Sequence, residues 1–268
     1  MILILFAACG QNNRNPKEKG TNLQLDTLAE EGIDFSIDTL NVNNYLLIFE
    51  NADSFKRTDI YGDLDYRIKL TDTVGNFFDK AEKIQTYLIN QFEDYFHLTD
   101  STLVLKLANG NTMNFDRYIE ERDWDNSEFV GYIFEHYFDK IDYYLLKVQY
   151  YEGNAWILVN RKNGFTKHIG GLPYISKDNK KIITINSDLY AGYSFNGIEL
   201  LSILADSLHL EFSVETEKWG PLDVKWINEN EFLLKRELFN VNSTITDYKY
   251  DYKRVRVENK TYTTHTAF

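Results

Sequence analysis

From about residue 100 onward, short apolar segments alternate with turn residues at intervals of roughly eight to twelve positions. The segments are rich in Tyr, Phe, Val, Leu and Ile, which pack well on a pleated sheet. The turns between them contain Gly, Asn or Pro: Asn109-Gly110, Glu152-Gly153-Asn154, Lys162-Asn163-Gly164 and Gly170-Gly171-Leu172-Pro173. This pattern is typical of an antiparallel sandwich, barrel or propeller and not of βαβ units. We therefore predict an antiparallel β-rich region over residues 99–258, followed by a tail over 259–268.

The preceding region, 25–98, has a mixed pattern. The stretch Val42–Phe49 ends in an apolar run suited to a buried strand, and Tyr66–Leu70 alternates as a half-buried strand does. Over about 76–96, apolar residues recur at three- and four-residue steps: Phe77, Phe78, Ala81, Ile84, Leu88, Phe92 and Tyr95. This spacing predicts one amphipathic helix. Its polar face mixes Lys with Asp and Glu, which favours packing on a sheet over binding to a membrane surface.

One turn links the β-rich region to a known architecture. Ser176-Lys177-Asp178-Asn179-Lys180 precedes two isoleucines and resembles the S-x-D-x-K turn of β-propeller blades. The region Leu103–Val257 thus resembles a β-propeller, or a related antiparallel meander, of the kind found in uncharacterised envelope proteins. A regular propeller would repeat about every forty residues, and the sequence has no strict repeat of that length. The expected fold is therefore mainly β, an irregular or partial β-propeller-like meander with one helix before it.

The charge balance excludes one class of partner. The chain has 29 Lys and Arg against 41 Asp and Glu, a formal net charge of −12. Such a negative field repels nucleic-acid phosphates, so no nucleic-acid partner is expected. The single cysteine, Cys9, cannot form an internal disulfide, and one thiolate cannot build a zinc site of the thiolate class. We expect no cofactor.

The N-terminus places this cysteine directly after a short apolar block, residues 2–8, which is far too short to span a bilayer. Phe6-Ala7-Ala8-Cys9 resembles the lipobox of bacterial lipoproteins, in which small residues precede a cysteine that is acylated and becomes the mature N-terminus. The chain departs from that family in two ways. Phe6 stands where Leu is usual, and no Lys or Arg precedes the block. A start upstream of Met1 would explain the missing charge.

The resemblance implies a location. Residues 1–8 would be a lipoprotein signal peptide, and the polar segment 9–24 would be a flexible tether. Acyl chains on Cys9 would anchor the protein in the membrane, because each buried CH₂ contributes roughly 0.8 kcal/mol. The expected location is the bacterial cell envelope, as an outer-membrane lipoprotein that faces the periplasm or the cell surface. The alternative is an unmodified cysteine buried near an ordinary apolar N-terminus.

Carboxylates and tryptophans near turns are the candidate site residues. Glu152, close to Trp156, could expose a carboxylate and an indole together, and the alternative is a hairpin turn whose aromatic rings pack inward. Trp219 precedes a Gly-Pro pair that we predict to be a turn, where its ring could stack on a sugar or a partner protein. The alternative is a ring that closes the end of the β core. Trp124 lies in the acidic segment 120–125.

No metal site is expected. Asp123, Asp125 and Ser127 have the alternate spacing of a calcium loop, but Glu128 and Phe134 stand where such a loop needs its glycine and its bidentate glutamate. The five histidines are widely spread and form no H-x-x-x-H pair. The sequence also has no G-x-S-x-G elbow, phosphate-binding loop or dinucleotide fingerprint.

These features favour a non-catalytic binding or interaction module for an envelope protein or glycan. Two alternatives stay open: a hydrolase of envelope polysaccharide or peptide that uses carboxylates, and an inhibitor or immunity lipoprotein. A hydrolase should gather two or three acids in one concave pocket, whereas a binding module should expose an aromatic or apolar patch.

Overall fold

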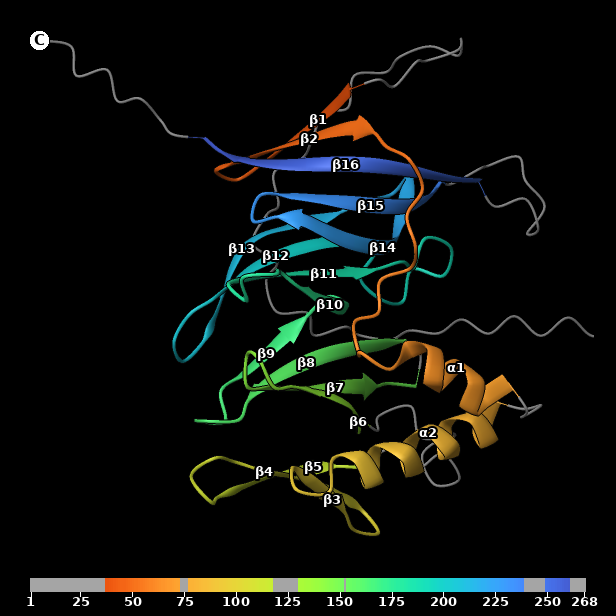
Figure 1. Cartoon of the computed structure of the whole chain (residues 1–268), viewed down its shortest axis with the longest axis vertical. Coiled ribbons are helices and arrows are strands. Elements are labelled where there is room, and N and C mark those ends of the chain that lie inside the picture. The colour runs from red at the N-terminus through yellow and green to blue at the C-terminus, as the bar shows by residue number, and fades with distance from the viewer. Residues whose placement is uncertain (1–36, 73–76, 118–129, 152, 239–248, 261–268) are drawn as a thin grey trace, which may run out of the picture. The chain divides into compact units, whose positions relative to one another are not determined.

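The alternating and apolar segments of the sequence form sixteen strands and two helices in the part of the chain that the computed structural model describes (Figure 1). That part comprises residues 37–72, 77–117, 130–151, 153–238 and 249–260. It lies within the second of the two units into which the chain divides, Phe35–Phe268. The predicted signal peptide and tether lie outside it, and the predicted domain boundaries stay predictions.

The strands form four antiparallel sheets, three of which follow the order of the chain. The first sheet contains β3 (Phe96–Leu98), β4 (Thr102–Lys106) and β5 (Thr112–Asp116). The second contains β6 (Gly131–Phe138), β7 (Tyr143–Gln149), β8 (Asn154–Asn160) and β9 (Thr166–Ile169). The third contains β10 (Leu172–Ile175), β11 (Lys181–Asn186), β12 (Gly197–Ile203) and β13 (Leu208–Glu215).

The fourth sheet joins strands from both ends of the described chain. Its order is β1 (Ile37–Val42), β2 (Tyr45–Asn51), β16 (Lys249–Asn259), β15 (Glu231–Leu238) and β14 (Trp219–Asn228). β16 pairs with β2 on one side and with β15 on the other, so that Val255 lies opposite both Phe49 and Phe232. The last sheet is therefore completed by the first strands of the fold.

Each sheet packs on the next one along the chain. One apolar cluster joins β3, β4 and the helix before them to the second sheet, another joins the second sheet to the third, and a further one joins the third to the fourth. Ile182 and Ile183, neighbours on β11, belong to different clusters because successive side chains of a strand point to opposite faces. Successively packed antiparallel meanders are the arrangement of propeller blades, so the predicted partial β-propeller-like fold is confirmed.

The predicted amphipathic helix is α2, Phe77–Gln91. Leu88, and Phe92 just after the helix, are buried against the second sheet. The helix ends before the predicted residue 96, where β3 already begins. In the described ranges, no helix has the length and the apolar character needed to cross a bilayer.

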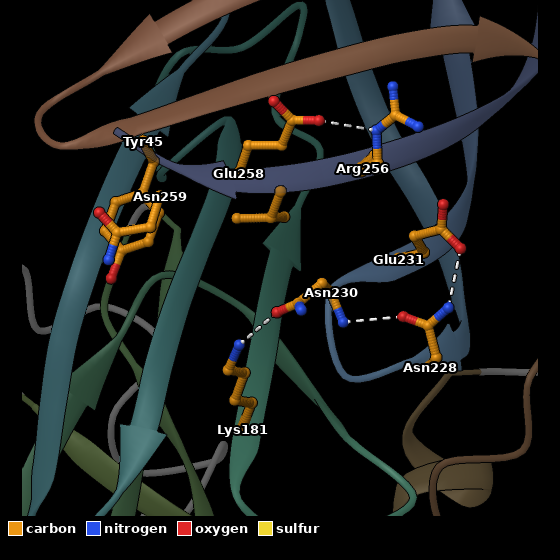
Figure 2. A pocket seen from close by; sticks show the side chains of 9 residues that line it. Tyr45, Lys181, Asn228, Asn230, Glu231, Arg256, Glu258 and Asn259 are labelled. Atoms are coloured by element: carbon orange, nitrogen blue, oxygen red, sulfur yellow. Dashed lines mark hydrogen bonds and ion pairs between the residues drawn. The ribbon is translucent and has the colours of Figure 1, made fainter. Parts of the chain in front are cut away.

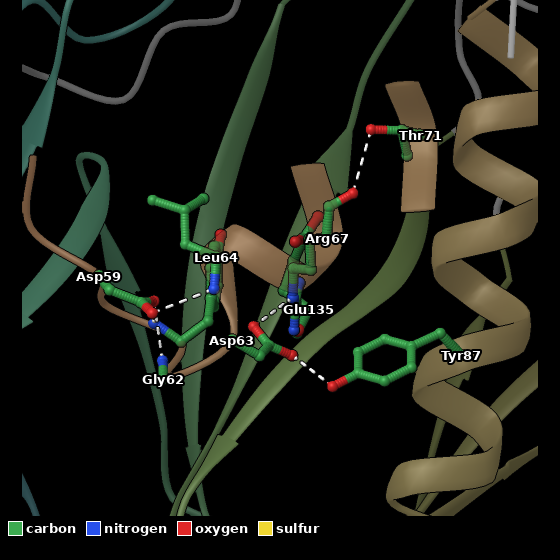
Figure 3. Close-up of polar contacts among 9 residues, drawn as sticks. Asp59, Gly62, Asp63, Leu64, Arg67, Thr71, Tyr87 and Glu135 are labelled. Atoms are coloured by element: carbon green, nitrogen blue, oxygen red, sulfur yellow. Dashed lines mark hydrogen bonds and ion pairs between the residues drawn. The ribbon is translucent and has the colours of Figure 1, made fainter. Parts of the chain in front are cut away.

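A shorter helix, α1 (Leu64–Asp72), corrects one prediction, because the alternating segment Tyr66–Leu70 is helical and not a strand. The Asp59 carboxylate accepts hydrogen bonds from the backbone amides of Tyr61, Gly62 and Leu64, where the helix begins (Figure 3). A carboxylate at this end satisfies amides that the helix itself leaves unpaired and interacts favourably with its dipole.

A buried ion pair holds α1 against the rest of the fold. Arg67 Nε donates to Asp63 Oδ1 at 2.7 Å, and Tyr87 on α2 donates its hydroxyl to the other oxygen of Asp63 at 2.8 Å (Figure 3). Arg67 also donates to the backbone carbonyl of Glu135 on β6 at 3.2 Å. These contacts attach the start of α1 to α2 and to β6.

Of the turns predicted from the sequence, Asn109-Gly110 is present and Trp219-Gly220-Pro221 is not. Asn109-Gly110 joins β4 to β5 as predicted, but Gly110 has a positive φ (85°) and Asn109 does not, so the turn is not the type I′ form that this pair suits. The stretch Val42–Phe49 contains a turn at Asn43, with φ 50°, between β1 and β2. Trp219-Gly220-Pro221 is not a turn, because these residues belong to β14. Pro221 is tolerated there since β14 is an edge strand.

Candidate binding surface

Two loops from neighbouring sheets meet at one end of the β region. β7 and β11 both point toward this end, on the right in Figure 1. The loop after β7 contains Gly153, and the loop after β11 covers residues 187–196. The backbone amide of Asn154 donates to Ser194 Oγ at 3.2 Å, which ties the two loops together.

Gly153 allows this close approach. Its φ is 91°, a conformation that side chains other than glycine rarely adopt. A Cβ at this position would lie 2.9 Å from Ser194 Oγ and 3.4 Å from the Cβ of Tyr193. The glycine that the sequence places in the turn therefore brings the two loops into contact.

Asp188 organises the longer loop from within. One oxygen of its carboxylate accepts a hydrogen bond from the amide of Gly192 at 3.1 Å, and the other accepts one from the amide of Ser194 at 2.5 Å. Its own amide donates to Asn196 Oδ1 at 3.1 Å. Such carboxylate-to-amide bonds fix a loop in one conformation without secondary structure.

The two loops expose large aromatic rings. Tyr151 is 57% exposed, Tyr190 57% and Tyr193 64%. Tyr190 donates its hydroxyl to Glu237 on β15 at 3.2 Å, and Glu237 lies opposite the exposed Tyr250 on β16. We call these four tyrosines the tyrosine surface.

A small pocket lies between the loops. It has a volume of about 230 Å³. Five of its eight lining residues have polar side chains, Asn154, Asn186, Ser187, Asp188 and Ser194, and the other three are Gly153, Ala191 and Tyr193. The side-chain Oδ1 of Asn154 is buried and accepts no hydrogen bond from the described residues. The site thus combines an exposed aromatic platform with a polar recess.

A larger concavity, of about 680 Å³, lies elsewhere on the β region (Figure 2). Its wall is polar, and its groups bond to one another. Lys181 Nζ donates to Asn230 Oδ1 at 3.0 Å, and Asn228 Nδ2 donates to Glu231 Oε2 at 2.8 Å. The wall is therefore occupied largely by its own contacts.

The carboxylates in this concavity do not form a catalytic pair. Glu231 bonds to Arg254 at 2.9 Å, and Glu258 pairs with Arg256 at 3.1 Å. The hydrogen bond from Arg254 keeps the pKa of the Glu231 carboxyl below its ordinary value, so Glu231 stays ionised at neutral pH. Glycoside hydrolysis needs one protonated acid, which Glu231 does not supply.

The two predicted site residues that the structure describes, Trp156 and Trp219, belong to different apolar clusters. Cys9, Trp124 and Glu152 fall outside the described residues. Trp156 on β8 is 8% exposed and belongs to the core between the second and third sheets, which leaves little of its ring for a ligand. Trp219 is half-buried, and its backbone carbonyl accepts a hydrogen bond from Asn196 of the loop 187–196 at 3.2 Å.

The ring of Trp219 is also engaged by the protein. It packs edge-on to Phe49, with ring centroids 6.2 Å apart, and the Arg236 guanidinium lies 5.0 Å from its centroid. These contacts favour a ring that closes the end of the core, the alternative left open by the sequence. Its role in ligand binding stays a prediction.

Sequence reasoning missed the tyrosines of the loop 187–196. A usable signal is present in SDLYAGYSFNG, where two tyrosines stand among Gly, Ser, Asp and Asn between two apolar strands. Turn-forming residues on both sides of a Tyr favour exposure of its ring. Nothing in the sequence around these tyrosines indicates that their loop contacts Gly153.

The comparisons with known proteins leave the function open. No protein-family model and no curated protein matches the chain. Among solved structures, it is similar to the crystal structure of TolB from Acinetobacter baumannii, with a TM-score of 0.22 and 12% identity. The match covers 59% of this chain and 41% of TolB, so the chain spans less than half of that protein.

Proposed function

We propose that this protein is a non-catalytic binding module of the bacterial cell envelope, anchored by acyl chains on Cys9 and recognising an envelope component through the tyrosine surface. The observation that carries the proposal is the group of exposed tyrosine rings on two interlocked loops. Exposed aromatic side chains at fixed positions are typical of recognition surfaces, because they supply large contact area at low cost in conformational entropy.

The anchor is proposed from the sequence alone. The apolar block, the small residues before Cys9 and the polar segment after it agree with a lipoprotein N-terminus. An acylated cysteine leaves the β region free to contact components near the membrane through its loops. The net charge of −12 opposes direct binding of the β region to anionic lipid headgroups.

A hydrolase is the weaker candidate. The carboxylates of the larger concavity are paired with arginines, and the small pocket contains a single carboxylate, Asp188, whose two oxygens bind backbone amides. Glu152, the acid that the sequence analysis names, lies outside the described residues. Neither of these two concavities therefore contains, among its described residues, a pair of acids with separate roles.

The test uses the full chain with Cys9→Ser in two steps. Metabolic labelling with a fatty-acid analogue should mark the wild type in the membrane fraction, and Cys9→Ser should lose both the label and the membrane attachment. The soluble Cys9→Ser protein should then co-sediment with isolated envelopes of the bacterium that encodes it. Adding Tyr190→Ser and Tyr193→Ser should weaken this binding more than about tenfold, as expected for a hot spot.

The matched control is Tyr66→Ser. Tyr66 is 52% exposed on α1, so the change removes a similarly exposed ring from another surface, and binding should stay at the Cys9→Ser level. Equal binding of all three proteins, or none by the Cys9→Ser protein, would overturn the recognition surface. An unlabelled wild type in the soluble fraction would overturn the anchor.

A further inference from the structure

The pocket beside Tyr193 is smaller than the roughly 300–1,000 Å³ of typical small-molecule sites. At about 230 Å³ it suits a single ring of a longer ligand and not a whole cofactor. The exposed rings of Tyr151 and Tyr190 lie on the same two loops. A chain-like ligand could therefore place one unit in the pocket and others over these rings.

The chemistry of the wall selects the kind of unit. Two amides, two hydroxyls and one carboxylate provide donors and acceptors in a small space. The described wall contains no Lys, Arg or His, so nothing there neutralises a phosphate or a carboxylate of a ligand. An apolar anchor from a protein partner would have to desolvate these polar groups without satisfying them. The wall fits a neutral ligand rich in hydroxyls.

Asp188 and Asn154 supply the acceptors for such hydroxyls. Each oxygen of the Asp188 carboxylate already accepts one backbone amide, and a carboxylate oxygen can accept two hydrogen bonds. The carboxylate is thus held in place with capacity to spare. Asn154 lines the pocket, and its buried Oδ1 has no partner among the described residues, so a donor that reached it would satisfy an unpaired acceptor.

Tyr193 supplies the apolar counterpart. Tyr193 lines the pocket, and the residue is 64% exposed. The faces of a pyranose ring carry C–H groups, which pack against an aromatic face, while its hydroxyls point outward to polar partners. Since Gly153 packs against the Cβ of Tyr193, the base of this platform is held in position.

From these contacts we infer that the pocket between Gly153 and Ser194 binds a pyranose unit of a neutral envelope polysaccharide, with Tyr193 stacking on the sugar and Asp188 and Asn154 accepting its hydroxyls. The inference rests on the proposed function and specifies the ligand of the same surface. Tyr151 and Tyr190 would contact adjoining sugar units.

The decisive experiment modifies the envelopes with periodate or protease and leaves the binding protein unchanged. The full-chain Cys9→Ser protein is sedimented with envelopes exposed to periodate, which cleaves vicinal diols of sugars, or to protease, which removes accessible proteins. Binding should fall more than tenfold after periodate and stay unchanged after protease. It should also persist when NaCl is raised from about 50 to 500 mM, because ion pairs at an exposed surface would weaken over that range.

Variants of Tyr193 separate stacking from hydrogen bonding. Tyr193→Phe keeps the aromatic face and should bind within twofold of the Cys9→Ser protein, whereas Tyr193→Leu should lose about tenfold or more. Circular dichroism of each variant, unchanged from the parent, excludes misfolding as the cause. Equal loss in both variants would overturn the stacking role.

The outcomes distinguish this inference from the proposed function. Binding that depends on the tyrosines but is destroyed by protease and resists periodate would assign the surface to a protein partner, so that the inference falls and the proposed function stands. Strong salt dependence would overturn the neutral ligand. Binding that does not depend on the tyrosines under any treatment would overturn both.

Discussion

At the scale of single residues, His136 on β6 has the most unusual environment. It is buried and packs against the rings of Tyr61, Phe92 and Phe138. Burial lowers its pKa to about 4, and the positive charge of Arg67 acts in the same direction. Three aspartates oppose the shift without cancelling it: Asp63, Asp139 and Asp59. The folded protein therefore holds this imidazole neutral.

The lowered pKa of His136 makes folding stability depend on pH. Between the folded value of about 4 and the ordinary value of 6.5, the unfolded chain binds a proton that the folded chain does not. The contribution of the neutral His136 to the free energy of unfolding is fully present above pH 6.5 and is lost as the pH falls toward 4. From pH 7.5 to 5.0, His136 should lower the free energy of unfolding by about 2 kcal/mol.

Urea unfolding of the wild type and His136→Phe at these two pH values measures this contribution. Phe suits the aromatic surroundings and cannot titrate, so the loss of stability on acidification should be about 2 kcal/mol smaller in the variant. His97→Phe, at an exposed position on β3, is the matched control and should keep the wild-type dependence. Equal pH dependence in wild type and His136→Phe would contradict the expected role.

At the scale of elements, the hydrogen bonds of the turn between β10 and β11 centre on the hydroxyl of Ser176. Ser176 is 3% exposed, and its Oγ accepts the amides of Lys180 and Lys181 at 3.2 and 2.9 Å while donating to Asp178 Oδ1 at 2.7 Å. Asn179 takes the positive φ that the turn needs, 59°. The sequence pattern of a blade turn thus corresponds to a closed set of hydrogen bonds.

Ser176→Ala should lower the free energy of unfolding by about 1 kcal/mol or more, because it removes the acceptor of the part-buried Lys181 amide, whereas the Lys180 amide keeps Asp178 Oδ1. Ser213→Ala, at an exposed position on β13, should change it by less than about 0.5 kcal/mol. Both values follow from urea denaturation monitored by tryptophan fluorescence. A Ser176→Ala protein as stable as Ser213→Ala would show that water replaces the hydroxyl in this turn.

The same scale shows where sequence reasoning succeeds and where it fails. Strands and the Ser176 turn are predictable because their signals are local. The segment 66–70 misleads because Tyr66 and Ile68 are exposed, and the buried residue of α1 is a charged one, Arg67. Its burial depends on the Glu135 carbonyl, 68 positions away, and no local period reveals such a partner.

At the scale of the whole molecule, the candidate site and the fourth sheet depend on contacts between distant segments. Gly153 meets Ser194 only because successive sheets place the loops of their second strands at the same end. The sequence shows a glycine turn and a tyrosine-containing loop, but not their contact. The two highlighted tryptophans that the structure describes, Trp156 and Trp219, are instead buried and half-buried, because large rings fill the space between sheets.

The pairing of β2 with β16 brings the first strands of the described fold against the last one. A disulfide across this pair would close a very long loop, which removes more entropy from the unfolded chain than a short loop does. The register places Glu50 opposite Arg254, next to buried Phe49 and Val255 on the two strands. Glu50→Cys with Arg254→Cys, in the Cys9→Ser background, should stabilise the oxidised protein by about 5 kcal/mol over its reduced form.

The matched control joins Asn41→Cys to Leu46→Cys, which face each other across the short β1–β2 hairpin and should add only about 2 kcal/mol on oxidation. Each variant is compared with its own reduced form, so the cost of the substitutions cancels. Denaturation with and without reductant gives both values, after mass spectrometry has verified the cross-link. If the long cross-link stabilises no more than the short one, the unfolded chain already holds its two ends together; if it fails to form, β2 and β16 do not pair.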